Sequence, residues 1–161
     1  MPRDAPILIL IGTQTGNSER VAEDVADALA DEGYTSRLVD MADALPEMLE
    51  EVERMIAVLC TWSDGTFPDN AVDFYESLVA IAPDLSGMAY GIIGLGDHLY
   101  DPYFLTAAYR LADTLDDLGA RRAVSTFEID KGPSPQDLDG ARVWALRCVE
   151  AFEARTGEPS A

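Results

Sequence analysis

The chain has 161 residues, of which 48% are hydrophobic, and its 11 basic and 30 acidic residues give a net charge of −19. This length suits one domain, predicted over residues 1–161 with its core at about 7–154, and the negative field argues against nucleic acid or an anionic membrane as a partner. No apolar run approaches the roughly 18 residues of a membrane span, and the start of the chain is too short and too polar for a signal peptide, so we expect a cytoplasmic location.

Short apolar runs alternate with helical patterns along the chain. Strands are predicted at Ile7–Ile11, Arg37–Asp40, Met55–Cys60, Ala89–Gly94 and Val124–Ile129. Helices are predicted at Ser18–Glu32, Pro46–Glu53, Asn70–Ala82, Leu105–Leu118 and Pro135–Ala154, followed by a frayed tail. Five strands that alternate with helices indicate a parallel sheet covered on both faces. Ligands of such sheets bind beyond the carboxyl ends of the strands, so the loops after the first, third and fourth strands are the informative ones.

The loop after the first strand has the composition of an anion site. Thr13, Thr15 and Ser18 supply hydroxyls, and free backbone N–H groups at the start of the next helix supply further donors. The loop has no lysine or arginine and no GxGxxG spacing, so it is not a Walker loop. A neutral loop of this kind suits one terminal phosphate held by many hydrogen bonds, although the same residues also favour a plain helix cap.

Two aromatic residues stand in polar loops after neighbouring strands. Trp62 follows the third strand and Tyr100 follows the fourth. Each alone fits a packing residue. Because both loops end at the same edge of the sheet, the pair also fits a sandwich around a flat ring.

Together these motifs resemble the flavodoxin family over essentially residues 7–154. The matching motifs are Thr13–Ser18, Cys60–Gly65, Pro68–Asn70 with Phe74 and Tyr75, and Gly94–Asp97 with Tyr100. The run Pro68–Asn70 is also similar to the FMN domains of diflavin reductases, and the chain length favours the short-chain, MioC-type branch of the family.

The resemblance implies a fold, a cofactor and a site. The fold is a flavodoxin-like three-layer α/β sandwich on a five-stranded parallel sheet of order 2-1-3-4-5, an order for which flavodoxin is itself the standard example. The cofactor is non-covalently bound FMN, with Trp62 over the inner face of its ring and Tyr100 over the outer face. The residues implied at FMN are Thr13, Gln14, Thr15, Gly16, Asn17 and Ser18 at the phosphate, and Thr61, Trp62, Ser63, Asp64, Gly65, Leu95, Gly96, Asp97, Tyr100, Tyr103 and Phe104 around the ring.

Two positions depart from the family pattern. The family usually has glycine where Ser63 stands, and a residue with a side chain opposes the backbone flip that accompanies flavin reduction by about 1 kcal/mol. Cys60 replaces a common serine and is interpreted as a buried apolar residue. Neither it nor Cys148 stands in the spacing of a disulfide framework or a zinc site.

Acidic residues on the two ring loops predict the redox behaviour. These residues are Asp64, Asp69, Asp97 and Asp101. Carboxylates beside a ring within aromatic walls oppose added negative charge, so a low second reduction potential and one-electron transfer are expected. His98 in the same region is interpreted as a solvent-exposed loop residue, with tuning of the potential as the alternative.

The expected function is that of a monomeric electron carrier, not an enzyme, between a basic-surfaced flavodoxin or ferredoxin reductase and an acceptor enzyme. The alternative is an NAD(P)H-dependent FMN or quinone reductase on the same fold, although no long insertion follows the fifth strand. A response-regulator receiver would need an acidic cluster after the first strand, where this chain has none. An adaptor without FMN would not need the hydroxyl loop, and the acidity also fits plain solubility or a salty cytoplasm.

Overall fold

The central sheet is built from strands that carry short apolar runs. The structure is a computed structural model that describes residues 6–13, 16–61, 67–97, 99 and 105–157. The strands are β1 (Ile7–Gly12), β2 (Ser36–Asp40), β3 (Arg54–Cys60), β4 (Ala89–Gly96), β5 (Arg121–Arg122) and β6 (Phe127–Asp130). All pairs are parallel in the order β2-β1-β3-β4-β5, and β6 also pairs with β4. The predicted order 2-1-3-4-5 is confirmed.

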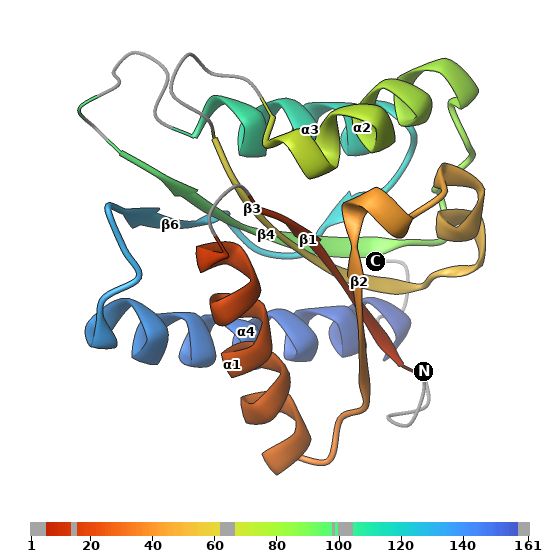
Figure 1. The fold of residues 1–161 in the computed structure, drawn as a ribbon. Coiled ribbons are helices and arrows are strands. Elements are labelled where there is room, and N and C mark those ends of the chain that lie inside the picture. The colour runs from red at the N-terminus through yellow and green to blue at the C-terminus, as the bar shows by residue number, and fades with distance from the viewer. Residues whose placement is uncertain (1–5, 14–15, 62–66, 98, 100–104, 158–161) are drawn as a thin grey trace.

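Helices cover both faces of this sheet (Figure 1). They are α1 (Asn17–Asp31), α2 (Asp69–Ile81), α3 (Thr106–Asp117) and α4 (Pro135–Gly157). One face carries α1 and α4, and the other carries α2 and α3. Alternation along β1 supplies both cores, because Ile9 packs with the α1 and α4 cluster while Leu8 and Leu10 pack with the α2 and α3 cluster. Among the described helices, none is long and apolar enough to span a bilayer.

Local side-chain bonds fix several helix ends. A reciprocal cap stands before α4, because Ser134 N donates to Asp137 Oδ2 over 2.8 Å and Asp137 N donates to Ser134 Oγ over 3.1 Å. The segment predicted as a helix at Pro46–Glu53 is a 3-10 helix over Pro46–Glu51. A further 3-10 turn, Met41–Asp43, begins where Asp40 Oδ1 accepts a hydrogen bond from Ala42 N over 2.8 Å.

The prediction of one strand at Val124–Ile129 is wrong in its bounds. Tyr90 pairs with Arg122, and Ile93 pairs with Phe127. Between these two pairs the chain advances three residues along β4 but five residues along the last strand. The extra residues form a bulge that separates β5 from β6. A long-range bond holds the bulge, since Trp144 Nε1 donates to the carbonyl oxygen of Ser125 over 2.9 Å.

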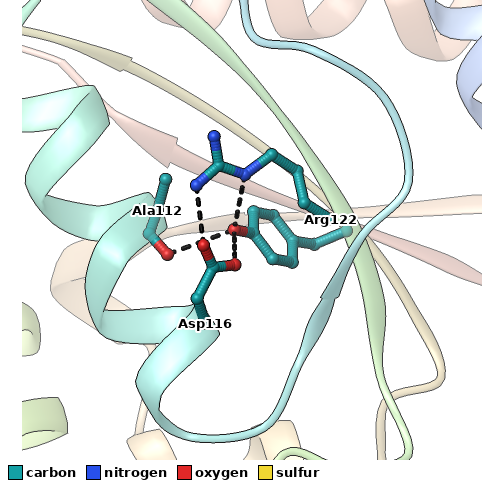
Figure 2. Close-up of polar contacts among 4 residues, drawn as sticks. Ala112, Asp116 and Arg122 are labelled. Carbon is teal, nitrogen blue, oxygen red and sulfur yellow. Dashed lines mark hydrogen bonds and ion pairs between the residues drawn. The ribbon is translucent and has the colours of Figure 1, made fainter.

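A partly buried polar network ties the amino end of β4 to α3 (Figure 2). Tyr90 is fully buried, and its hydroxyl donates to Asp116 Oδ1 over 2.5 Å and lies 3.1 Å from the carbonyl oxygen of Ala112. Arg122 closes the network by donating from Nε to that hydroxyl over 3.2 Å and from Nη2 to Asp116 Oδ2 over 2.7 Å. Burial, followed by the hydrogen bond to Asp116, raises the pKa of Tyr90 well above its ordinary range.

This raised pKa predicts a loss of stability in alkali. The neutral phenol favours the folded state, so its contribution is complete below the unfolded pKa of about 10 and is lost as the pH rises toward the higher folded pKa. Tyr90→Phe is expected to lower the free energy of unfolding by about 1–2 kcal/mol at pH 7 and to flatten the decline above pH 10. Urea unfolding from pH 7 to 11 measures both effects.

Tyr109→Phe is the comparison variant. In the wild type, the hydrogen bond from Tyr109 to Glu128 raises the pKa of Tyr109 to about 12. Because the Tyr109 side chain is exposed, Tyr109 should contribute less than Tyr90 to the loss of stability in alkali. An alkaline decline as steep in Tyr90→Phe as in the wild type would contradict the assignment to Tyr90.

Candidate ligand site at the carboxyl edge of the sheet

The carboxyl ends of β1, β3 and β4 lie side by side. Gly12 at the end of β1 pairs with Leu59, and Cys60 at the end of β3 pairs with Leu95. The chain passes from β1 to β2 on one side and to β3 and β4 on the other, so the winding direction changes between β1 and β3. An open parallel sheet of this order has its ligand crevice at that point.

The segment after β1 leads directly into α1. Gly16 has φ +92 and is the N-cap of α1, where it supplies no side-chain cap. The left-handed φ requires glycine at this position, and Gly16 N donates to Thr13 Oγ1 over 2.7 Å. Of the other predicted phosphate residues, Asn17 begins α1, whereas Gln14 and Thr15 lie outside the described residues.

Ser18, the second residue of α1, is buried at the start of that helix. Its side chain is fully buried, and its Oγ has no hydrogen-bond partner among the described residues. A buried polar group left in this state is destabilising by about 1–3 kcal/mol. An anion at the uncapped start of α1 would satisfy that hydroxyl together with the free N–H groups of the first turn. The residues present therefore fit a phosphate group.

Asn70, to which the sequence analysis gave no role at the site, connects the loop after β1 to α2 and to the end of β2. Asn70, the second residue of α2, accepts a hydrogen bond from Thr13 N over 2.8 Å. Its Nδ2 donates to Asp40 Oδ1 over 2.7 Å and to the carbonyl oxygen of Ile11 over 3.3 Å. The only sequence signal was the asparagine in the run Pro68–Asn70, which did not reveal its partners.

The loop after β3 is held at both ends. Thr61 N donates to the carbonyl oxygen of Leu95 over 2.9 Å, and Thr61 Oγ1 accepts a hydrogen bond from Ala107 N in the first turn of α3 over 3.0 Å. At the other end, Phe67 is buried and stacks on Tyr75 with 4.2 Å between ring centroids. Between these anchors, Trp62, Ser63, Asp64 and Gly65 lie outside the described residues.

The loop after β4 has its first residues in the described part of the chain. Leu95 is buried in the α1 and α4 cluster, and the carbonyl oxygen of Gly96 accepts a hydrogen bond from Lys131 N over 2.8 Å. Asp97 is half-buried and accepts a hydrogen bond from Leu99 N at its Oδ1 over 2.8 Å, which makes a tight turn. The predicted ring residues Tyr100, Tyr103 and Phe104, with His98 and Asp101, lie outside the described residues. Among the residues described, no group of acidic, histidine and cysteine side chains could hold a metal ion.

Comparison with known proteins agrees with this architecture. The flavodoxin family model matches residues 9–144. The chain is 30% identical over 138 residues to the sulfite reductase [NADPH] flavoprotein alpha-component of Bacillus subtilis, covering 83% of the chain and 23% of that protein. It is 34% identical over 143 residues to the NADPH–cytochrome P450 reductase of Drosophila melanogaster, covering 83% of the chain and 20% of that protein. The chain thus spans only about a fifth to a quarter of these two relatives.

Solved flavodoxin structures match over nearly their whole length. Flavodoxin 2 of Bacillus cereus superimposes with a TM-score of 0.82 at 28% identity, covering 91% of this chain and 99% of that one. The flavodoxin of Streptococcus pneumoniae TIGR4 superimposes with a TM-score of 0.81 at 28% identity and the same coverage. The sheet order, the hydroxyl loop at the switch point and these matches together show that the chain belongs to the flavodoxin family of FMN-binding proteins.

Proposed function

We propose that residues 7–154 form one FMN-binding domain that carries single electrons at low potential between a reductase and an acceptor enzyme. The observation that carries this proposal is the fully buried hydroxyl of Ser18, which has no hydrogen-bond partner among the described residues and lies at the start of α1, next to the switch point of the sheet. The bound flavin would supply the redox chemistry. The residues proposed to hold it are those implied by the family motifs, with Thr13, Gly16 and Ser18 at the phosphate.

Acidic residues of the chain would lower the second reduction potential of the bound flavin. Asp69 at the start of α2 is exposed, and Asp97, directly after β4, is half-buried. Both are proposed to stand beside the flavin ring. Carboxylates there disfavour additional negative charge on the ring and lower the second potential. A net charge of −19 would also steer a basic partner toward the protein.

The proposal includes a monomer in the cytoplasm and a separate source of electrons. The curated relatives are reductases in which the matching region is 20–23% of the length. A carrier of this kind would receive its electrons from such a reductase and would not oxidise NADPH by itself.

The test is an anaerobic stepwise reduction of the FMN-loaded protein, followed by visible spectroscopy and a redox titration. We expect two one-electron steps, with the second at the lower potential, and no NADPH oxidation by the protein alone. A single two-electron step with rapid NADPH oxidation would favour the reductase alternative. Failure to bind FMN would overturn the proposal as a whole.

Ser18→Ala tests the phosphate assignment with two readouts of opposite sign. Loss of a hydrogen bond to a charged phosphate is worth about 1.5–3 kcal/mol, so the dissociation constant of FMN should rise about tenfold to a hundredfold. The apo protein should become slightly more stable, because the unpartnered hydroxyl is gone. Fluorescence titration measures the first effect and urea unfolding the second.

Riboflavin is the internal control for this variant. It has the flavin ring without the phosphate, so its affinity should be unchanged in Ser18→Ala. An unchanged FMN dissociation constant, or equal losses for both ligands, would show that Ser18 does not contact the phosphate.

A further inference from the structure

The Asn70 side chain uses both ends of its amide at once. Its Oδ1 accepts from Thr13 N over 2.8 Å, and its Nδ2 donates to Asp40 Oδ1 over 2.7 Å and to the carbonyl oxygen of Ile11 over 3.3 Å. The backbone N–H of Thr13 requires an acceptor, whereas the carboxylate of Asp40 and the carbonyl of Ile11 require a donor. Only one orientation of the amide satisfies all three partners.

The partner Asp40 is itself fixed. The same Oδ1 accepts a hydrogen bond from Ala42 N over 2.8 Å at the start of the 3-10 turn that follows β2. The carboxylate therefore holds the Asn70 amide from the β2 side, and Asn70 holds the first residue of the loop after β1. This pair links segments that lie 30 and 57 residues apart in the sequence.

The link continues into the start of α1. Thr13, held by its backbone N–H, accepts at its Oγ1 the hydrogen bond from Gly16 N over 2.7 Å, and Gly16 is the N-cap of α1. The backbone at the start of this loop is closely packed at Gly12. A Cβ on Gly12 would lie 3.0 Å from Met41 Sδ and 3.3 Å from Ala71 Cβ, both next to the residues of the pair.

We propose that Asp40 and Asn70 form a positioning pair that presets the loop after β1 for the phosphate of a flavin nucleotide. The inference rests on the proposed function and adds two residues that act through Thr13 and Gly16. The pair therefore governs selection of the phosphorylated flavin over the unphosphorylated one.

The chemistry of the pair defines matched variants. Asn70→Ala removes all three side-chain hydrogen bonds without a change of charge. Asn70→Asp keeps the shape and the acceptor for Thr13, but it lacks the donor and sets two carboxylates against each other. Asp40→Asn alone keeps an oxygen that can accept from both Ala42 N and Asn70, so it should be mild. Combining Asp40→Asn with Asn70→Asp exchanges the amide and the carboxylate and conserves the total charge, so it relieves the repulsion between two carboxylates. It does not restore every bond, because the atom at position 40 that faces position 70 also accepts from Ala42 N, and the Ile11 carbonyl oxygen loses its donor.

The experiment measures FMN and riboflavin dissociation constants for the wild type, the three single variants and the exchanged double variant. We expect Asn70→Ala and Asn70→Asp to weaken FMN about tenfold or more, with riboflavin changed by less than about threefold, as for loss of one or two hydrogen bonds. We expect Asp40→Asn to have little effect and the double variant to recover part of the FMN affinity lost in Asn70→Asp, because the repulsion between two carboxylates is removed.

Two results would overturn the pair: an unchanged ratio of FMN to riboflavin affinity in the Asn70 variants, or no recovery in the double variant. Hydrogen exchange of the wild-type apo protein is a second measurement that needs no variant to fold. Protection of the Thr13 and Gly16 amides is expected, and rapid exchange at both would also overturn the pair. A wild-type protein that binds neither flavin, with both amides protected, would instead overturn the proposed function.

Discussion

Gly91→Ala should lower the free energy of unfolding by about 2–3 kcal/mol, a large effect for one added methyl group. Gly91 lies in the middle of β4, where α4 packs against the sheet. A Cβ at this position would lie 2.6 Å from Cys148 Sγ and 2.9 Å from Cη2 of Trp144. Both neighbours belong to a helix that packs tightly on β4, so neither can move aside without loss of packing. Urea unfolding at neutral pH gives the value.

Two further variants make this prediction specific. Gly87→Ala is the matched control, because a Cβ there would meet nothing within 4 Å, and its effect should stay within about 0.5 kcal/mol. Cys148→Ala removes the nearer obstacle, so its combination with Gly91→Ala should be less destabilising than the sum of the two single changes. Strict additivity would show that Cys148 is not what a side chain at position 91 meets.

Phe67→Ala should lower the free energy of unfolding by about 3–4 kcal/mol and should weaken FMN binding as well. Phe67 is buried, stacks on Tyr75, and has the Arg110 guanidinium carbon 5.7 Å from its ring centroid. The ring therefore joins α2 to α3 at the end of the loop that is proposed to hold the flavin. Thermal and urea unfolding measure the stability, and fluorescence titration measures the affinity for FMN.

Tyr75→Phe is the matched control for Phe67. It keeps the stacked ring and removes only the hydroxyl, which lies 2.8 Å from Thr114 Oγ1, so about 1 kcal/mol should be lost. Riboflavin should lose affinity alongside FMN in Phe67→Ala, in contrast to Ser18→Ala, because the loop that ends at Phe67 is proposed to hold the ring and not the phosphate. Retention of full riboflavin affinity would separate Phe67 from the ring site.

The fold could be predicted from the sequence where the signal is local. Ile7–Ile11 is a continuous apolar run, which is what a strand buried on both faces requires, and it forms β1 almost as expected. The cap at Ser134 lies within a few residues of the helix that it starts. The family and its cofactor were likewise carried by short contiguous motifs.

The features that could not be predicted from the sequence depend on contacts between segments that lie far apart in the chain. The bulge between β5 and β6 rests on Trp144 meeting Ser125 from another layer. Asn70 meets Thr13 and Asp40 only after α2 has packed beside β1 and β2. The hydroxyl of Ser18 was expected at the phosphate, but its complete burial with no partner in the described part of the chain depends on packing and has no sequence signature.

The bulge in the last strand also disfavours edge-to-edge strand pairing between copies of this chain. The outer edge of the sheet on this side is divided into β5, with two arginines, and β6, where Glu128 and Asp130 are exposed. A second chain that tried to extend the sheet would find short, charged pieces in place of a long row of free N–H and C=O groups. The divided last strand therefore offers a poor template for edge-to-edge pairing between copies of this chain.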